Sequence, residues 1–459
     1  MTIDKVVASP REAVADIRDG ATIVTSGFGV NHGFAASLIV ALRAQGARHL
    51  RIIANSLGTG PFRAQSLIEN HQVDRLIVSF TGRAGAGLSA AEEQIRAGEI
   101  TVELVAQGTL VERLRAGGAG IGAIYTRTGV GTEIAAGKEI RLFDGVPHVL
   151  ETALRADYGF IRAFRADRFG NLQFRGAGRN FNPSFAKSAG IVIAEVNEIV
   201  EGELDPELVG LPGIFVDRVV RQTEVPPVVP PVPRTAEGAE VARTYNGKLA
   251  WSRAEVAEIA AGLLPEPSYV NLGLGMPTLM SDYISGRDIV LHSENGLLGY
   301  SDLATAENFD PELYNAGSQF VTLAPGASFF DSCTSFEMVR GGHLDVVVLG
   351  AFQVDSQANL ANWTTPEIVG GAIGGAMDLV ASGATVMVLM AHCERNGEAK
   401  LVRRCSLPLT GIGCVDLVVT DLCVLRRRDG RFVIERTAPG FTMSEVVALA
   451  EMELLPSDA

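Results

Sequence analysis

The sequence is short of cysteine and aromatic residues, and none of its apolar runs is long enough to cross a bilayer. Its 459 residues include five cysteines, an odd number without C-x-x-C spacing, which argues against a disulfide framework or a zinc site. The opening segment, MTIDKVVASPREAVADIRDG, is charged and lacks the apolar core of a signal peptide. We therefore expect a cytoplasmic protein with no membrane contact, no bound metal and scattered buried thiols.

Positive charge is also scarce. The chain carries 39 Lys and Arg against 53 Asp and Glu, a formal net charge of −14. A nucleic-acid-binding surface needs a basic face, so this balance argues against nucleic acid as a partner. The 47% hydrophobic content and 51 glycines are instead typical of an α/β enzyme with two or three domains that acts on small molecules.

Proline is concentrated in one segment, TEVPPVVPPVPRTAEGAE, at residues 223–240. Proline at this density favours extended chain and interrupts both helix and sheet. We therefore predict a linker at residues 223–246 between a first domain, 1–222, and a second domain, 247–459.

Two helix starts can be predicted from capping boxes, in which Ser or Thr precedes Glu by three residues. One is Ser252 with Glu255, followed by an apolar stripe at helical spacing, Val256, Ile259, Leu263 and Leu264. The other is Thr442 with Glu445.

The two halves of the chain resemble each other. Three pairs of segments occur in the same order: ATIVTSGFG (21–29) with SYVNLGLG (268–275), VELVAQG (102–108) with VTLAPG (321–326), and DRFGNL (167–172) with DSQANL (355–360). We predict an α/β fold made of two homologous domains, each around a largely parallel sheet. Ligands of such sheets bind at the carboxyl ends of the strands.

The glycine-rich turns SGFGVNHG and NLGLGMP each follow a predicted strand. Their backbone N–H groups could bind phosphate, but neither turn matches a dinucleotide fingerprint or a P-loop, and a simple tight turn explains them equally well. No nucleophile elbow accompanies His292 or His343, so we interpret both histidines as structural.

The segment SENG places a carboxylate, Glu294, directly after the predicted buried strand RDIVLH. Helix capping, if the next segment is helical, a salt bridge or solvent exposure are ordinary explanations. The neighbours Ser293, Asn295 and Gly296 are, however, small or amide-bearing, as a crowded ligand site requires. A partly desolvated carboxylate is also a competent nucleophile toward an acyl carbon. The residues alone leave both kinds of explanation open.

At this point the sequence resembles the class I CoA-transferases, specifically the 3-oxoacid (succinyl-CoA:3-ketoacid) type, over nearly its whole length. The matching motifs are SENGLLG, LAPGASFF, MVRGGHLDVVVLGAFQV, LANW, GGAMDLV and LPLTG in the second half, and QGTLVERLRAGGAGI, YTRTGVGT, DRFGNLQFRGAGRNFN and PGIFVDRVV in the first. That family often divides its α and β subunits between two chains, which here resemble a fused pair joined at the proline-rich linker.

The resemblance implies a duplicated CoA-transferase fold and ping-pong catalysis, in which Glu294 is the nucleophile that carries a glutamyl-CoA thioester. It implies that the backbone N–H of Gly375 stabilises the oxyanion. The substrate- and CoA-binding residues that it implies are Gly27, Gly29, Asn55, Gln107, Asn271, Gly273, Gly275, Asn295, Gly296 and Gly374. Coenzyme A would be a co-substrate, with no tightly bound cofactor. Apart from the resemblance, we expect a homodimer because soluble oligomers usually close with two-fold symmetry.

Three departures from the family pattern concern the acid acceptor rather than the reaction. Ser26-Gly27-Phe28 replaces Gly-Gly-Phe and is followed by an apparent one-residue insertion. Residues 81–93 are longer and richer in glycine than the family's segment, and Ser318 replaces a lysine, which removes a cation that could pair with a substrate carboxylate or phosphate. Acetoacetate and 3-oxoadipate are both compatible acceptors. An acyl-CoA hydrolase and a non-catalytic ligand-sensing relative are compatible with the same fold.

Overall fold

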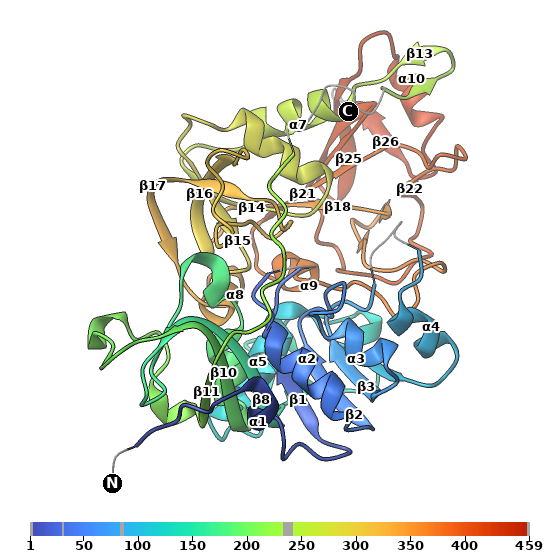
Figure 1. Cartoon of the computed structure of the whole chain (residues 1–459). Coiled ribbons are helices and arrows are strands. Elements are labelled where there is room, and N and C mark those ends of the chain that lie inside the picture. Colours follow the sequence, from blue (N-terminus) through green and yellow to red (C-terminus); the bar gives the residue numbers. More distant parts are fainter. Residues whose placement is uncertain (1–2, 30–31, 83–86, 233–241, 457–459) are drawn as a thin grey trace.

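The structure is a computed structural model that describes residues 3–29, 32–82, 87–232 and 242–456. Two α/β halves lie one above the other, the first half blue to green and the second half yellow to red in Figure 1. No helix in the described ranges is long and apolar enough to cross a membrane.

The first half is built on a parallel sheet with the strand order β11-β10-β8-β1-β2-β3-β4. Several of its strands are short apolar runs, as expected of parallel strands that are covered on both faces, whereas β8 and β10 have 11 residues each. They are β1 (Thr22–Thr25), β2 (Leu50–Ala54), β3 (Val73–Val78), β4 (Thr101–Leu104), β8 (Ala156–Ala166), β10 (Ala189–Ile199) and β11 (Arg218–Arg221), with β9 (Leu172–Gln173) antiparallel to β8.

The second half is built on a sheet with the order β17-β16-β15-β14-β18-β21-β23-β24-β25-β26. Its centre, from β15 to β23, is parallel as predicted, whereas antiparallel strands extend it on both sides. The strands are β14 (Ser268–Leu272), β15 (Ile289–Ser293), β16 (Leu297–Leu303), β17 (Val321–Phe329), β18 (Val346–Gly350), β21 (Thr385–Met390), β23 (Leu417–Thr420), β24 (Cys423–Arg428), β25 (Arg431–Thr437) and β26 (Leu454–Pro456).

Short helices and small sheets complete each half. The helices are α1 (Pro10–Ala13), α2 (Ala36–Gln45), α3 (Gln65–Glu69), α4 (Ala90–Arg96), α5 (Gln107–Gly118), α6 (Asn182–Lys187), α7 (Arg253–Gly262), α8 (Ser332–Arg340), α9 (Ala376–Val380) and α10 (Met443–Val447). The small sheets combine β5 (Ala123–Thr126), β6 (Ile140–Phe143) and β7 (Val146–Thr152), and β19 (Gln353–Asp355), β20 (Leu360–Ala361) and β22 (Leu401–Val402).

Both predicted capping boxes are confirmed, at the starts of α7 and α10. A third box, Ser89 with Glu92, begins α4. Residues 223–232 of the predicted linker form no helix or strand, and residues 233–241 lie outside the described residues. The last part of the predicted linker instead forms β12 (Thr244–Tyr245), which pairs with β13 (Lys248–Leu249).

The internal repeat is confirmed down to single hydrogen bonds. Asp167 Oδ1 accepts the backbone N–H groups of the residues two and four positions later, at 3.0 Å each, and its Oδ2 accepts Asn171 Nδ2 at 2.8 Å. Asp355 repeats this pattern at 3.0, 3.1 and 3.0 Å, with Asn359 in the place of Asn171. The two halves therefore share this local design as well as the order of the parallel strands at the centre of each sheet.

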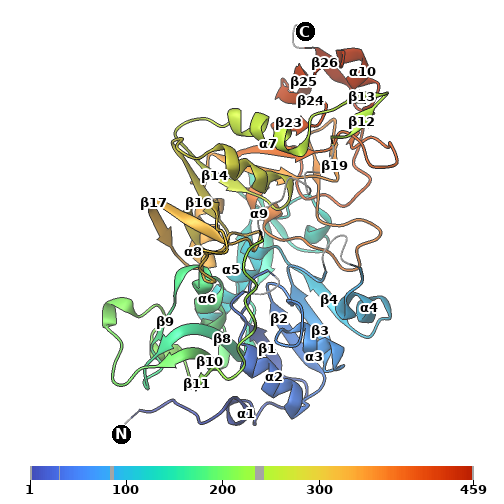
Figure 2. The ribbon, with the colours of Figure 1, turned by 45° about the horizontal axis from the view of Figure 1, so that its top comes forward.

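The halves meet at the helices that follow the carboxyl ends of the strands. Helix α5 of the first half packs against α8 and α9 of the second half (Figure 2). Phe80, just after β3, forms an antiparallel bridge with Ala372. Groups from both halves are thus brought to one cleft.

Candidate active site

Glu294 lies at the carboxyl end of β15, in the turn that leads into β16. The turn is tight: Gly296 has a φ of +101°, and a Cβ there would come within 2.0 Å of the Phe330 carbonyl oxygen. Asn295 fixes the loop by donating from Nδ2 to the Tyr314 carbonyl at 2.7 Å. Because the next segment is a strand and not a helix, helix capping does not explain the glutamate.

The carboxylate of Glu294 is buried, with 8% of the residue exposed. Burial, reinforced by the negative charge of Asp378, raises the pKa of Glu294 to about 7. Among the described residues, the Glu294 carboxylate accepts a hydrogen bond from its own backbone N–H and from no other residue. It also forms no salt bridge with a described residue. The ordinary explanations for a buried glutamate are therefore not met.

Gly375 lies directly beside the carboxylate, at the N-terminus of α9. A Cβ at residue 375 would stand 3.1 Å from Glu294 Oε1, 3.1 Å from Gln107 Oε1 and 3.2 Å from Phe336 Cε1. Only glycine leaves room for an acyl group here. The preceding residue, Gly374, has a φ of +56° and packs against the Phe80 ring, which fixes the start of the helix.

Two amide side chains reach the site from the first half. Gln107, the first residue of α5, donates from its backbone N–H to the Gly374 carbonyl at 2.9 Å and from Nε2 to Asn55 Oδ1 at 2.7 Å. Asn55 follows β2, and its Nδ2 is buried with no hydrogen-bond partner among the described residues. The structure thus brings Asn55 and Gln107 to the same side of the cleft as Glu294 and Gly375.

The second glycine-rich turn lines the cleft beside β15. Gly273 and Gly275 follow β14, and Gly275 begins the 3-10 helix Met276–Tyr283 with a φ of +87°. Asn271 lies deeper, where its Nδ2 is 3.0 Å from His292 Nδ1. His292 is fully buried, also contacts Ser335 Oγ at 2.9 Å, and is a structural residue as predicted.

The first glycine-rich turn faces the loop that holds Ser318. A Cβ at Gly29 would collide with Ser318 Oγ at 2.0 Å, so residues 29 and 318 are in direct contact across the two halves. Gly27, with a φ of +139°, packs on the Phe34 ring instead. The predicted one-residue insertion falls between Phe28 and Gly33, where residues 30 and 31 lie outside the described residues; His32 is described and stacks on Tyr314 with ring centroids 3.8 Å apart.

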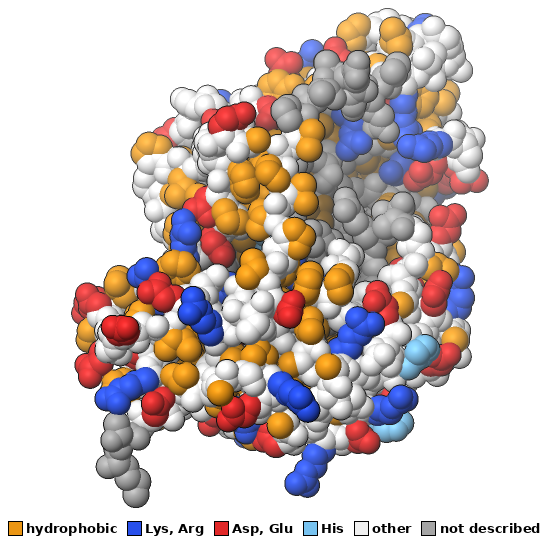
Figure 3. Space-filling model, in the orientation of Figure 1, with side chains coloured by type: hydrophobic (Ala, Val, Ile, Leu, Met, Phe, Trp, Pro, Cys, Tyr) orange, Lys and Arg blue, Asp and Glu red, His pale blue; other side chains and the backbone are white. Residues whose placement is uncertain are grey.

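A cavity of roughly 1750 Å³ joins these groups. Eight of the residues predicted for catalysis or binding line it, namely Gly29, Asn55, Gln107, Gly273, Gly275, Glu294, Gly374 and Gly375. The other four, Gly27, Asn271, Asn295 and Gly296, are not among the lining residues. Figure 3 shows the hollow between the two halves, with Lys and Arg side chains on its upper side.

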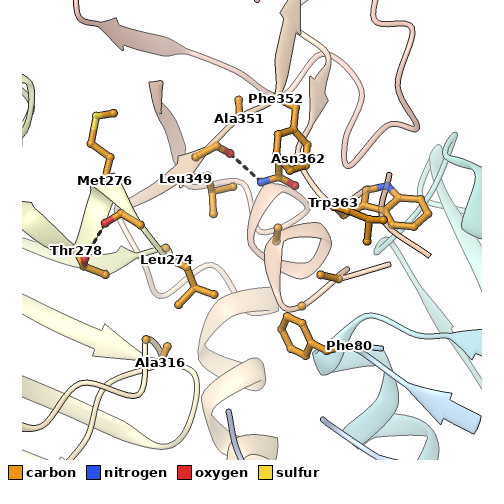
Figure 4. Close-up of a pocket in the computed structure, with 18 of the residues that line it drawn as sticks. Phe80, Leu274, Met276, Thr278, Ala316, Leu349, Ala351, Phe352, Asn362 and Trp363 are labelled. Carbon is orange, nitrogen blue, oxygen red and sulfur yellow. Dashed lines mark hydrogen bonds between the residues drawn. The ribbon is translucent and has the colours of Figure 1, made fainter. Parts of the chain in front are cut away.

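Apolar side chains form much of the cavity wall (Figure 4). Phe80 comes from the first half, and Leu274, Leu349, Phe352 and Trp363 come from the second. Sequence reasoning missed these residues because each belongs to an ordinary hydrophobic pattern. A dry wall of this kind keeps water from a reactive intermediate.

Cations line the cavity away from Glu294. They are Arg243, Arg253, Arg395 and Lys400, and Lys400 Nζ lies 3.5 Å from Glu394 Oε1. Lys400 belongs to the loop after β21, and β21 is separated from β15 by β14 and β18. At about 4.8 Å per strand spacing, the ends of β21 and β15 lie on the order of 14 Å apart.

The segment 81–93 is partly described. Residues 83–86 lie outside the described residues, while Thr81, Gly82 and the residues from Gly87 to Ala90 line the cavity beside Glu92. Thr81 Oγ1 donates to the carbonyl oxygens of Val369 and Gly371 at 2.9 and 3.1 Å. The segment therefore contributes both to the wall and to the contact between the halves.

One group of side chains has donor atoms close enough for a metal ion, namely Glu112, Cys333 and Glu337. Glu112 is already paired with Arg115 at 2.7 Å and with Arg340 at 2.6 Å. Burial and the nearby carboxylates raise the pKa of Cys333 to about 12, so the thiolate that a metal would need is disfavoured. These contacts favour a structural role. All five cysteines are free, as predicted.

The fold and the site together define an α/β protein with a buried carboxylate and a backbone N–H at one end of a ligand-sized cavity. The chain matches the family described as Coenzyme A transferase over residues 7–222 and 253–449, and it belongs to that family. The two matched stretches lie on either side of the proline-rich segment.

Relatives with known names cover most of the chain. It is 38% identical over 468 residues to the mitochondrial succinyl-CoA:3-ketoacid coenzyme A transferase 2A of Rattus norvegicus, an alignment that spans 97% of this chain and 88% of that protein. It is 50% identical over 175 residues to one of the subunits of the 3-oxoadipate CoA-transferase of Pseudomonas putida, which spans 38% of this chain and 82% of that subunit.

The fold is also seen in solved structures. An acyl-CoA transferase from Escherichia coli O157:H7, solved as a thioester complex with CoA, superposes with a TM-score of 0.79 at 21% identity and covers 99% of this chain and 94% of that one. The predicted fold class, two largely parallel-sheet α/β domains of the CoA-transferase type, is therefore confirmed.

Proposed function

We propose that the protein is a 3-oxoacid CoA-transferase, which moves CoA from an acyl-CoA such as succinyl-CoA to a 3-oxoacid such as acetoacetate. The observation that carries the proposal is the Glu294 carboxylate, buried beside Gly375 with no hydrogen bond or ion pair to another described residue. The relative from Rattus norvegicus, with which the chain aligns over 97% of its length, is named for the same activity.

In the first half-reaction, a Glu294 oxygen attacks the thioester carbonyl carbon of the donor. The C–S bond breaks, the CoA thiolate leaves, and an acyl-glutamyl anhydride remains. The thiolate then attacks the glutamyl carbonyl of the anhydride, which releases the donor acid as a carboxylate and leaves a glutamyl-CoA thioester. This is covalent catalysis by a carboxylate nucleophile.

The second half-reaction reverses these steps with another acid. The acceptor carboxylate attacks the glutamyl thioester, the thiolate leaves, and it then attacks the acceptor's carbonyl carbon, which regenerates the Glu294 carboxylate. Each addition places negative charge on a carbonyl oxygen. The N–H of Gly375 is the group that we propose stabilises that charge.

The cations 243, 253, 395 and 400 fit the phosphates of CoA. The end of β21, after which Arg395 and Lys400 follow, lies three strand spacings, on the order of 14 Å, from the end of β15, which leaves room for an extended pantetheine arm. Binding at the remote end supplies free energy that can be used at the reacting carbon. CoA is a co-substrate in this scheme, and the steps above require no further cofactor.

Two acceptor classes remain candidates on the same chemistry. The relative from Pseudomonas putida is named a 3-oxoadipate CoA-transferase subunit and is 50% identical over the 175 aligned residues. Steady-state kinetics with acetoacetate and 3-oxoadipate distinguish them: the preferred acceptor gives the higher kcat/KM. Parallel double-reciprocal lines are expected for either acceptor, and intersecting lines would contradict a ping-pong scheme.

A hydrolase would release CoA from acyl-CoA with no acceptor acid present. We expect no such release above the rate of the uncatalysed reaction, because the wall around Glu294 is apolar. We further propose a homodimer in the cytoplasm, for which light scattering after size exclusion and cell fractionation are the tests.

A further inference from the structure

Asp378 lies one turn after Gly375, on α9, and is completely buried. Its carboxylate faces the first half of the chain. Oδ2 accepts the backbone N–H of Gly108 at 2.8 Å, and Oδ1 accepts the hydroxyl of Thr128 at 3.0 Å. Both donors belong to the other half, and Gly108 directly follows Gln107.

The contact between Gly108 and Asp378 is so close that only glycine fits at residue 108. A Cβ at residue 108 would lie 2.4 Å from Asp378 Oδ1 and 2.5 Å from Arg340 Nη1. The start of α5 is therefore pressed against the Asp378 carboxylate. A side chain at this position would separate the two helices that carry Gln107 and Gly375.

The charge of Asp378 is balanced within the same interface. Arg340 Nη1 lies 3.7 Å from Asp378 Oδ1, and Arg340 Nη2 donates to Glu112 Oε1 at 2.6 Å. Glu112 is on α5 and Arg340 is on α8, so the pairs link α5, α8 and α9. A buried carboxylate with these partners is costly to remove singly.

The equivalent place in the other half does not hold a carboxylate. Ser188 in the first half and Ser382 in the second half make matching contacts: each Oγ donates to the carbonyl three residues earlier, at 2.7 and 2.6 Å. The residue four positions before each serine is Ser184 in the first half and Asp378 in the second, so these two residues are equivalent. The acid thus occurs only on the side of the molecule that contains Glu294. This asymmetry indicates that it serves the site and not the shared fold.

We propose that Asp378 is a positioning residue for CoA transfer: it fastens the N-terminus of α5 to α9 and so holds Gln107 and the N–H of Gly375 on either side of the Glu294 carboxylate. The inference rests on the proposed function. Asp378 does not touch substrate; besides its charge, which adds to the effect of burial on the pKa of Glu294, it acts through Gly108 and through the helix that begins at Gly375.

The test compares Asp378→Asn with Asp355→Asn. Asp355 is an equally buried acid of the same half that also accepts backbone N–H groups but lies outside the cavity lining. For Asp378→Asn we expect kcat for CoA transfer from succinyl-CoA to acetoacetate to fall about 100-fold, because small misplacements of reacting groups cost that much, with KM for succinyl-CoA within about twofold. Asp355→Asn should lose thermal stability and keep kcat.

Thr128→Val gives the milder form of the same test. It removes one hydroxyl donor to Asp378 and leaves the charge, so a roughly fivefold fall in kcat is expected from the loss of one hydrogen bond. If Asp378→Asn does not fold, this variant decides alone. An unchanged kcat in the folded Thr128→Val protein would then overturn the proposal.

A folded Asp378→Asn enzyme with wild-type kcat, or with a changed KM and an unchanged kcat, would also overturn the proposal. Failure of the proposed function itself has a different signature, because wild-type enzyme would then form no CoA adduct on Glu294. A wild-type adduct with an unaffected Asp378→Asn variant refutes only the positioning role.

Discussion

The carboxyl ends of β15 and β2 occupy equivalent places in the two halves and line the same cavity, yet only the end of β15 carries a carboxylate there. Val24 pairs with Ile53 and Val270 with Leu291 in matching register, so that Ser56 stands where Glu294 stands in the second half. Ser56 Oγ is occupied by a hydrogen bond to the Gly29 carbonyl at 2.7 Å.

The residues around Glu294 and Ser56 also differ between the two halves. Gln107 donates its backbone N–H to the Gly374 carbonyl, and Ser332 donates to the Asn180 carbonyl, each at 2.9 Å. In the second half Gly375 follows the acceptor Gly374. In the first half Phe181 follows the acceptor Asn180, and the buried Phe181 ring stacks on the Phe185 ring with centroids 5.3 Å apart. One copy of the interface is therefore open and charged, while the other is filled and apolar.

The comparison teaches that the duplicated fold supplies the place and that a few substitutions supply the chemistry. Burial by itself does not mark the catalytic carboxylate. Glu195 in the first half is also fully buried, with its pKa raised to about 7 by burial, but it accepts N–H groups from Ser37 and Leu38 at 2.7 and 3.2 Å. Glu294 has no such partners among the described residues.

Glu294→Gln should have the largest effect. The amide keeps the shape and loses the nucleophile, so turnover is expected to fall by about 10⁴-fold or more in a CoA-transfer assay. Glu195→Gln is the matched control, a buried glutamate outside the cavity lining. Equal activity of the two variants would break the distinction between the halves.

Gly375→Ala comes next. The new methyl group would lie 3.1 Å from Glu294 Oε1 and Gln107 Oε1, in the space that an acyl group must enter. We expect kcat to fall about 100-fold, a loss typical of a disturbed oxyanion site. Gly262→Ala, in open space near the end of α7, is the control and should leave kcat unchanged.

The stability of the protein should depend on pH through Glu294. Its pKa is raised from 4.5 to about 7, so the stabilisation of the protonated form is complete below pH 4.5 and is lost as the pH rises through 7. Glu294→Gln should thus unfold like wild type at about pH 4 and be more stable by about 3 kcal/mol at about pH 8. Urea unfolding at both pH values measures the difference, and a constant difference would show that the carboxyl is not desolvated.

Asp167→Asn and Asp355→Asn should destabilise the protein by similar amounts, on the order of 2 kcal/mol each, because each leaves buried N–H groups without their acceptor. The two turns share one hydrogen-bond pattern. Thermal unfolding of both variants would show whether the two halves use it equally. A large effect in one half alone would restrict the duplication to topology.

Ser318→Lys should have the smallest effect. Its side chain contacts Gly29 across the cleft and lines the cavity, so a lysine there would bring a cation toward the bound acid. We expect the ratio of kcat/KM for 3-oxoadipate to that for acetoacetate to rise severalfold. The effect should be no larger, because a partly exposed pair of the lysine and the acid is screened by water. An unchanged ratio between 3-oxoadipate and acetoacetate would remove Ser318 from the determinants of specificity.

Much of the architecture could be predicted because it depends on local patterns. The capping boxes, the apolar strands and the repeated Asp-x-x-x-Asn turns each lie within a few residues of sequence. The hairpin from β15 to β16 was missed, although Asn295-Gly296 between apolar segments is a strong hairpin signal. The Ser89–Glu92 capping box is a local signal of the same kind, and it marks the start of α4.

The composition of the site was harder to predict, because its members meet only in the folded chain. Gly108 and Asp378 are 270 residues apart, and no periodicity connects them. The neighbours in SENG made Glu294 a candidate, but its role as nucleophile and the role of Gly375 were implied only by the resemblance to a family. The apolar wall and the Asp378 contact required coordinates, since they depend on how the two halves pack.

The most direct measurement is mass spectrometry of the protein after mixing with succinyl-CoA or acetoacetyl-CoA, followed by borohydride reduction and peptide mapping. We expect one CoA adduct, on the peptide that contains Glu294, and its disappearance when a carboxylic acid acceptor is added. An adduct on another residue, or turnover without any adduct, would contradict the account.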